Sequence, residues 1–393
     1  MNVDSQPTDW RSIAIVYLSG AVAATALLKV SPAALDLRAG FGIGLSEVAW
    51  ITSIFTLMTV AMGVFIGHWV ARFGARKLAG LGLLAMALAS IATLFAIGPV
   101  SLFFGRMMEG FGYVLVLVSA PTLMVGLASP QNSRLVLGVW STWLPTGGVA
   151  IMLAAPTLLA IAGWQGLWMF SAVAALIALA LLTRVPPPAK SGPLPAVDLR
   201  QALAHLKPWL LGLTFVFFTV QLYAVLLFAP TYLVQEVGLT VTRSTLVTSV
   251  VLIMAGVGGL LGSVIMHRGA APNLVMGSCL VIVAALIPCL VIFAHTGLPA
   301  LGLLVIYGLV AGCVPPCIYA QAPSAAYVPA ATGIVLGLVM AGNGLGYLLG
   351  PPAVAGVIEA TSSWRLGTAV PVIACGCGVV CAWVLSRLNP TTG

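Results

Sequence analysis

Three charged side chains lie within long apolar stretches of the chain, where a charge is costly and therefore informative. They are Lys29, Arg106 and Glu109. On insertion scales a charged residue in the middle of a span costs roughly 2.5–3.5 kcal/mol. Residues of this kind usually pair with one another, face a cavity or take part in moving an ion. The three residues are therefore the first candidates for binding an anion and for carrying a proton.

Lys29 has two interpretations. It lies in the outer half of the apolar stretch 12–35, so its long stem could let the ammonium reach the membrane interface. Alternatively, Lys29 binds a substrate anion beside the kink that Pro32 predicts. A point charge with three donors suits a carboxylate or a small inorganic anion. Asp36 is seven residues further on and faces the same way, so it is a possible structural partner of Lys29 and a second candidate for proton coupling.

Arg106 and Glu109 are three residues apart, so they share a helical face and can form an ion pair. One interpretation is structural, with the pair fixing the position of its helix. In the other, Glu109 binds and releases a coupling proton as the pair rearranges. Glu109 is the only carboxylate well inside a span, so the proton has few other sites. Arg106 and Lys29 would then supply the positive potential that attracts an anion.

The composition indicates the kind of protein that must position these residues. Charged residues make up 6% of the 393 residues, against about 25% in a soluble domain, and 61% are hydrophobic. The mean hydropathy is +1.14. Soluble and disordered chains are excluded. Apolar runs of about 20 residues or more fit helices that cross a bilayer, whereas the strands of a membrane β-barrel would alternate.

The apolar stretches predict an all-α membrane protein with twelve transmembrane helices. They lie at about 12–35, 46–70, 77–97, 102–126, 134–161, 165–184, 208–232, 243–266, 273–294, 299–324, 331–357 and 366–387. A proline-rich polar linker, 186–207, separates two groups of six helices. The predicted domains are therefore an N-terminal six-helix bundle over 1–185 and a C-terminal six-helix bundle over 208–393, joined by that cytoplasmic linker.

The distribution of basic residues predicts the orientation. With the N-terminus inside, eleven of the 16 Lys and Arg residues fall on the cytoplasmic side and three on the outer side. Both termini are therefore expected in the cytoplasm, with the protein in the inner membrane of a bacterium. The basic residues are scattered, so nucleic acid is not an expected partner. The expected partners are a small molecule, protons and membrane lipid, and we expect a monomer.

An internal repeat relates the two halves. A constant shift of 195 residues aligns Gly67 with Gly262, Gly74 with Gly269, Gly147 with Gly342 and Pro156 with Pro351. A shift of six helices keeps the topology, so the halves are expected to be parallel repeats. In such folds the substrate site lies near the midplane between the halves, and one half rocks on the other.

The loop after the second stretch resembles the signature loop of the major facilitator superfamily, G-x-x-x-D-R-x-G-R-R/K. The matching residues run from Gly67 to Lys77, although Ala71 replaces the aspartate of that pattern and Ala75 replaces the first arginine of its closing pair. The resemblance implies that this loop and its C-terminal copy form an inner gate. The gating residues it implies are Gly67, Arg72, Gly74, Arg76, Gly262, Arg268 and Gly269.

The run from Arg106 to Gly112 resembles the second motif of the same superfamily, in the form R-x-x-E-G-x-G. Together with the tryptophan-rich fifth stretch and its Pro145-Thr-Gly147-Gly148, it resembles the cyanate and nitroimidazole permease group. The superfamily implies secondary transport by alternating access, often coupled to protons. A proton gradient would be the energy source, and no cofactor is expected.

The C-terminal half offers polar but uncharged side chains within its spans. Tyr223, Tyr319, Gln321 and Asn343 are predicted to bind the substrate through hydrogen bonds, and Gln221, Tyr232, Tyr307 and Tyr347 are further polar groups there. No arrangement of nucleophile and base predicts an enzyme, and neither a catalytic residue nor a metal site is predicted. The predicted function is proton-coupled uptake of a small organic or inorganic anion. The alternative is a proton-antiport exporter of amphiphilic compounds, although Pro145 and Gly147 depart from the spacing of the superfamily's exporter motif.

Overall fold

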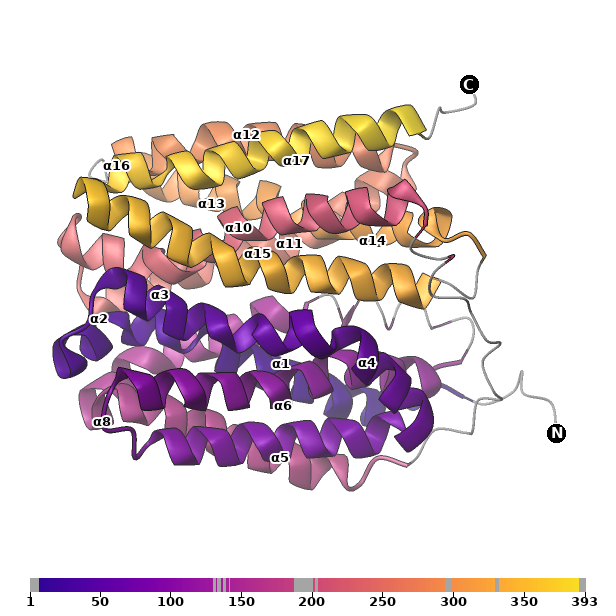
Figure 1. The fold of residues 1–393 in the computed structure, drawn as a ribbon, viewed down its shortest axis with the longest axis horizontal. Coiled ribbons are helices and arrows are strands. Elements are labelled where there is room, and N and C mark those ends of the chain that lie inside the picture. Colours follow the sequence, from indigo (N-terminus) through magenta and orange to yellow (C-terminus); the bar gives the residue numbers. More distant parts are fainter. Residues whose placement is uncertain are drawn as a thin grey trace. The chain divides into compact units, whose positions relative to one another are not determined.

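The computed structural model describes residues 7–129, 132, 136, 139–140, 142–186, 201, 204–293, 298–328 and 332–388. Within these ranges the regular structure is helical, without strands (Figure 1). The helices are α1 (Trp10–Leu28), α2 (Val30–Phe41), α3 (Leu45–Ser53), the 3₁₀ turn η2 (Ile54–Thr56), α4 (Leu57–Phe73), α5 (Ala75–Thr93), α6 (Pro99–Gly126), α8 (Trp143–Leu182), α10 (Leu206–Gln235), α11 (Val241–His267), α12 (Pro272–Ile292), α13 (Leu298–Gly312), α14 (Val314–Ala325), α15 (Thr332–Thr361), α16 (Trp364–Gly367) and α17 (Ala369–Leu388). The predicted all-α membrane fold is confirmed.

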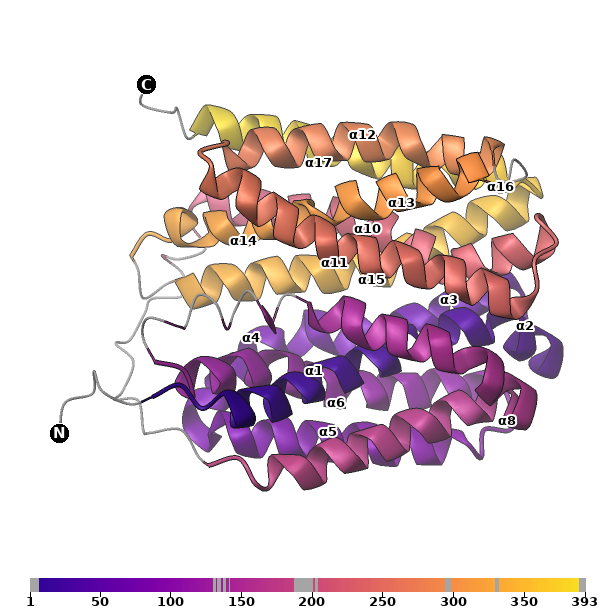
Figure 2. The same ribbon diagram turned by 180° about the vertical axis from the view of Figure 1, so that it is seen from behind.

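The described ranges contain 11 helical stretches that are long and apolar enough to cross a membrane, where the sequence predicts twelve helices. The difference lies in α8, whose 40 residues would extend about 60 Å, twice the thickness of the hydrocarbon core. Its backbone is not helical at Ala162 and Gly163, and Gly163 has a φ of 58°, which favours glycine. Figure 2 shows the two arms of α8 meeting at this turn. The turn separates the two predicted helices 134–161 and 165–184.

Four other predicted spans are interrupted without ending. The first divides into α1 and α2 at Lys29, because Pro32 has no N–H to donate to the carbonyl of residue 28. The tenth divides into α13 and α14 beside Pro315 and Pro316, for the same reason. The second divides into α3, η2 and α4, and no proline accounts for that break. The twelfth divides into α16 and α17 at Thr368.

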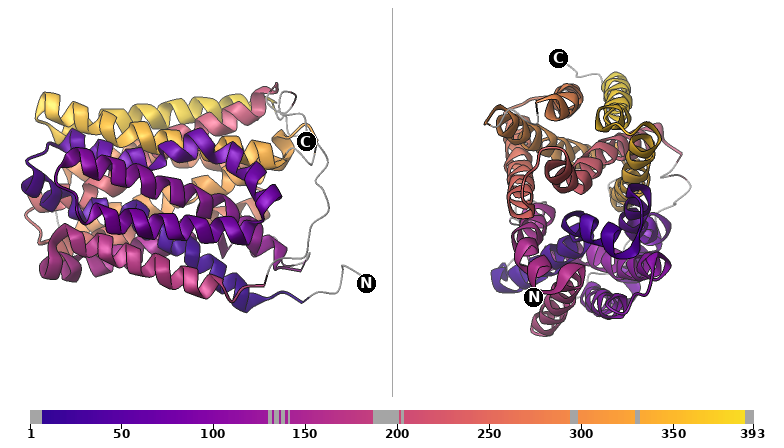
Figure 3. Two further views of the ribbon diagram at one scale, coloured as in Figure 1. Left: turned by 60° about the horizontal axis from the view of Figure 1, so that its bottom comes forward. Right: turned by 90° about the vertical axis from the view of Figure 1, so that its left-hand side faces the viewer.

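The chain forms two compact units that do not follow the midpoint of the sequence strictly. Unit 1 contains Met1–Phe41 and Ile54–Leu194, and unit 2 contains Gly42–Ser53 and Pro195–Gly393. In unit 1, α1 packs on α8 and α5 packs on α6; in unit 2, α10 packs on α15 and α17. Within each unit the helices run broadly along one direction (Figure 3). Most of the predicted linker 186–207 lies outside the described residues.

Positions related by the shift of 195 residues share backbone features. Gly74 and Gly269 both have a positive φ, of 87° and 97°, where each ends a helix. Gly147 of α8 lies so close to α1 that a Cβ there would stand 2.0 Å from the carbonyl oxygen of Ala21. The equivalent Gly342 of α15 would place a Cβ 2.4 Å from the carbonyl oxygen of Gly212 on α10. The helix pair α1 and α8 therefore approaches as closely in unit 1 as α10 and α15 do in unit 2.

Candidate functional site

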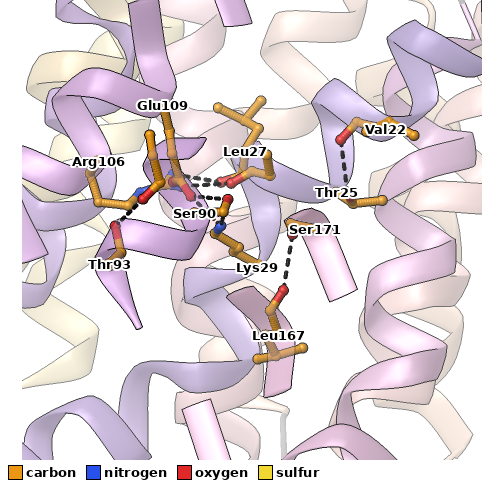
Figure 4. Close-up of polar contacts among 12 residues, drawn as sticks. Val22, Thr25, Leu27, Lys29, Ser90, Thr93, Arg106, Glu109, Leu167 and Ser171 are labelled. Carbon is orange, nitrogen blue, oxygen red and sulfur yellow. Dashed lines mark hydrogen bonds and ion pairs between the residues drawn. The ribbon is translucent and has the colours of Figure 1, made fainter. Parts of the chain in front are cut away.

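Four polar side chains of unit 1 meet in its interior. Lys29 lies at the junction of α1 and α2, Ser90 lies near the end of α5, and Arg106 and Glu109 lie on α6. Each side chain is at most 1% exposed. The break that Pro32 imposes places Lys29 at the end of α1, with its N–H still bonded to the carbonyl of Thr25. Figure 4 shows the four side chains pointing toward one another. We call these four residues the ion cluster.

Glu109 is the centre of the ion cluster. Its Oε1 lies 2.5 Å from the Lys29 Nζ and also accepts a hydrogen bond from the Ser90 hydroxyl. Its Oε2 accepts from Nη1 of Arg106. Lys29 also donates to the Ser90 Oγ at 3.1 Å. One carboxylate therefore bridges two buried cations, and the three ionised groups together carry a charge of +1.

Arg106 also holds the end of α1. Its Nη1 donates to the carbonyl of Ala26 at 2.8 Å, and its Nη2 donates to the carbonyl of Leu27 at 3.5 Å. The last carbonyls of a helix have no partner within that helix, so the guanidinium supplies donors where the interruption at Lys29 leaves acceptors. The planar fork of arginine can serve the carboxylate and these carbonyls at once.

Aromatic rings cover both cations. The Lys29 Nζ lies 4.5 Å from the centroid of the Trp168 ring, and the Arg106 Cζ lies 4.2 Å from that of Phe55. A cation over a ring face is attracted by roughly 0.5–2 kcal/mol, more when water is excluded. The rings therefore help to offset the desolvation of the two cations.

The structure resolves several predictions about these residues. The predicted pairing of Arg106 with Glu109 is confirmed. The interpretation in which the Lys29 ammonium reaches the membrane interface is wrong, because this side chain is 0% exposed and contacts Glu109. The described partners of Lys29 are Glu109 and Ser90 in place of Asp36. The part played by Ser90 was missed, because a serine in an alanine-rich helix carries no signal of its partner. The substrate and proton roles stay predictions.

The polar residues predicted in the C-terminal half lie in unit 2. Tyr223 of α10 packs against Tyr347 of α15, with ring centroids 4.1 Å apart, and its hydroxyl hydrogen-bonds with Asn343. Tyr319 of α14 meets the ring of Phe215 edge-on, with centroids 5.6 Å apart. The structure thus brings Tyr223 and Asn343 together. Gln321 instead donates to the Cys317 carbonyl of its own helix at 3.0 Å.

Gln221 and Tyr307 form a second buried polar pair in unit 2. The Tyr307 hydroxyl donates to the Gln221 Oε1 at 2.7 Å, and both side chains are 0% exposed. The Gln221 Nε2 finds no hydrogen-bond partner within the part of the chain that the structure describes. This pair was not among the predicted site residues, because its members lie 86 positions apart.

The sequence profile of the Major Facilitator Superfamily matches residues 13–335. The chain belongs to this superfamily. The resemblance inferred from the loop after the second span and from the α6 motif is thus confirmed, whereas the narrower resemblance to the cyanate and nitroimidazole permease group stays a prediction.

Solved structures of superfamily members share the fold. A bacterial homologue of the human lysosomal transporter Spinster, in an inward-facing and occupied conformation, is 16% identical, with 98% of each chain covered and a TM-score of 0.79. A D-xylose–proton symporter is 15% identical, with 96% of this chain and 97% of that chain covered and a TM-score of 0.73. At these identities the likeness concerns the fold alone.

A curated relative is the methylenomycin A resistance protein of Bacillus subtilis (strain 168). It is 26% identical over 181 residues. The match spans 44% of this chain and 39% of the relative, well under half the length of that relative.

The superfamily's signature loop lies at the junction of α4 and α5. Gly74 ends α4, and Arg76 donates through Nη2 to the carbonyl of Thr183, just beyond α8, at 2.6 Å. In the C-terminal copy, a Cβ at Gly262 would stand 2.9 Å from the carbonyl oxygen of Cys313. Arg72 lies at the end of α4, although its side chain is outside the described set, and Arg268 and Gly269 follow the end of α11. Gly67 lies within α4, six residues before its end. Their gating role stays a prediction.

Proposed function

We propose that this superfamily member is a secondary active transporter that takes up a small organic or inorganic anion together with protons. The observation that carries the proposal is the bridging of Lys29 and Arg106 by the single carboxylate of Glu109. With Glu109 ionised, the three groups carry a charge of +1. When Glu109 binds a proton the charge becomes +2, and both cations lose their counter-ion. A buried unpaired cation is costly, so the protonated site favours an incoming anion.

This exchange couples the two ligands. A proton on Glu109 strengthens binding of the anion, and by thermodynamic linkage the bound anion strengthens binding of the proton by the same factor. Symport requires this positive coupling, because the loaded carrier must hold both ligands. Lys29 would be the direct ligand of the anion, since its ammonium has three donors and its stem can turn. Arg106 would stay anchored to the α1 carbonyls.

The polar groups of unit 2 would provide selectivity. Tyr223, Tyr319, Gln321 and Asn343 carry hydrogen-bonding groups without charge, which can recognise the shape of a substrate without opposing its charge. Alternating access of the two six-helix repeats would expose the site to each side in turn. We further propose a monomer in the inner membrane of a bacterium, with both termini in the cytoplasm and the proton gradient as the energy source.

A second candidate is export of amphiphilic compounds by proton antiport. The similarity to the methylenomycin A resistance protein favours it, over the 44% of the chain that aligns. An antiporter needs substrate and proton to compete for one site. The net positive charge of the ion cluster repels a cationic substrate, so on charge grounds we place this candidate second.

The test is transport by the purified protein in proteoliposomes. The panel contains radiolabelled small carboxylates, small inorganic anions and a cationic dye, each with and without an inward proton gradient. We expect gradient-driven accumulation of an anion. Glu109→Gln should abolish accumulation and leave exchange of labelled for unlabelled anion intact, while Glu236→Gln, an exposed carboxylate of unit 2, serves as the control. Normal accumulation by Glu109→Gln, or outward movement of the dye alone, would contradict the proposal.

A further inference from the structure

The short helix α3 packs with a part of the chain that is remote in sequence. Gly42–Ser53 belongs to unit 2, although the residues on both sides of it belong to unit 1. α3 packs against α15. Its Leu45 and Ala49 join a buried apolar cluster formed with Ala224, Leu227, Phe228, Val354, Ala355 and Ile358. α3 is therefore held in unit 2 by side chains, while covalent bonds connect it to unit 1.

One carboxylate fixes the start of α3. Glu359, near the end of α15, accepts the Ser46 backbone N–H at 2.9 Å through Oε1, and its Oε2 accepts the Ser46 hydroxyl. A carboxylate at a helix N-terminus satisfies free N–H groups and favours the helix dipole. Gly44 leaves room for it, because a Cβ there would stand 2.7 Å from the Glu359 Oε1. We call Glu359 and its contacts with Gly44 and Ser46 the clasp.

Both ends of α3 have the features of a joint. On one side Gly42 has a φ of +64°, which favours glycine. On the other side the helix tightens into η2, and the division between the two units falls at this turn. A stretch of 3₁₀ helix inside a longer helix often marks a hinge. The segment between these joints can therefore move as a piece.

At η2, the side chain of Phe55 contacts a member of the ion cluster, Arg106. The Phe55 ring lies over the guanidinium of Arg106, at 4.2 Å, and its centroid is 4.8 Å from that of Tyr113. The backbone of Phe55 lies against α6 so closely that a Cβ at Gly110 would stand 1.9 Å from its carbonyl oxygen. Gly110 follows Glu109 directly. A change in the pairing of Glu109 and Arg106 therefore acts on residues that touch η2.

We propose that α3 is a gate segment held closed by the clasp, and that Phe55 is the positioning residue that transmits the state of Glu109 to it. The idea rests on the proposed alternating access. α3 follows the first membrane-spanning stretch, and Glu359 lies near the end of α15, which is the last membrane-spanning stretch but one. Both therefore lie on the side opposite the N-terminus, and the clasp would close the path from that side.

The clasp is tested by chemical labelling without any substrate. In a variant whose seven cysteines are replaced by alanine or serine, Ala49→Cys reports the position of α3, because Ala49 is 0% exposed. N-ethylmaleimide should label it only when α3 leaves α15. Glu359→Gln should raise the labelling rate about fivefold, as expected for weakening charged hydrogen bonds at an exposed site. Glu236→Gln is the matched control and should not change the rate.

The transmitting role of Phe55 is tested in the same assay. Glu109→Gln should change the labelling rate of Ala49→Cys several-fold, and this change should disappear when Phe55→Ala is also present. An unchanged rate in Glu359→Gln would overturn the clasp, and a change that persists without the Phe55 ring would overturn the transmission. If Ala49→Cys does not fold, Leu45→Cys replaces it as the reporter. Because the assay uses no substrate, its failure is distinct from failure of the uptake proposal.

Discussion

The two units stabilise buried polar groups in different ways. Unit 1 buries Lys29, Arg106 and Glu109 in one network, whereas the polar pairs described in unit 2, such as Gln221 with Tyr307, are neutral. A charged network can exchange one of its members for a proton or a bound ion, because the charge balance then changes. A neutral pair can only exchange hydrogen bonds. The proposed function accordingly assigns coupling to unit 1 and substrate selection to unit 2, and the following variants test the difference in buried charge between the two units.

The largest effect is expected for Glu109→Ala. It removes the counter-ion of two buried cations, and loss of one partner of a buried pair costs about 3–5 kcal/mol. Thermal unfolding in detergent, followed by tryptophan fluorescence, should show a large fall in the midpoint. Adding Lys29→Met should restore part of the loss, because one unpaired cation is removed with it. A fall no larger than that of Gln221→Leu in unit 2 would show that charge does not distinguish the units.

The next prediction concerns two substitutions that disturb helix packing without changing any charge. Gly110→Ala in unit 1 and Gly258→Ala in unit 2 each force a Cβ against backbone, within 1.9 Å of the Phe55 oxygen and 2.0 Å of the Leu309 oxygen. Each should lower the free energy of unfolding by about 1–3 kcal/mol. Only Gly110→Ala should also alter the labelling of Ala49→Cys. Equal effects of both variants on labelling would mean that general loosening moves α3.

A smaller effect is expected for the neutral pair. Tyr307→Phe removes the donor to Gln221 and should cost about 1–2 kcal/mol, since the Gln221 oxygen remains buried. Gln221→Leu should cost a similar amount, and the double variant less than the sum of the two. Thermal unfolding measures all three. Additive costs would show that the observed bond contributes nothing.

The smallest effect concerns a charged helix cap outside the membrane spans. Asp9 caps α1 by accepting the Ser12 N–H at 3.0 Å, and hydrogen bonds from Ser12 lower the pKa of Asp9 below its ordinary value of 3.8. Its ionised form therefore stabilises the fold above pH 3.8, and the contribution is lost as the pH falls through the lower pKa of the folded state. Asp9→Asn should change stability at pH 7 by less than about 0.5 kcal/mol, because Asn also caps well.

The Asp9 prediction is checked by unfolding at several pH values. Only the unmodified protein should lose this small contribution in acid. Ser363→Asn at the start of α16 in unit 2 is the control, because Ser363 caps through a neutral hydroxyl and its replacement should leave the acid dependence unchanged. Identical acid profiles of the Asp9 variant and the unmodified chain would contradict the assignment.

The sequence predicted features that depend on neighbours along the chain. The pairing of Arg106 with Glu109 followed from their spacing, because residues three apart share a helical face. The interruption near Pro32 followed from the missing N–H of proline. By contrast, Lys29 and Glu109 are 80 positions apart, and Ser46 and Glu359 are 313 apart. No local pattern specifies which face of one helix meets which face of another.

The membrane-spanning helical architecture and its superfamily were determined by the sequence alone, because apolar length and loop glycines are local properties. Only the tertiary structure decided that one carboxylate serves both cations and that α3 packs with unit 2. These features depend on how helices rotate and slide as they pack. Many residues together determine the rotation and position of each helix. The resulting contacts are known only once the structure shows which side chains of distant helices lie within hydrogen-bonding distance.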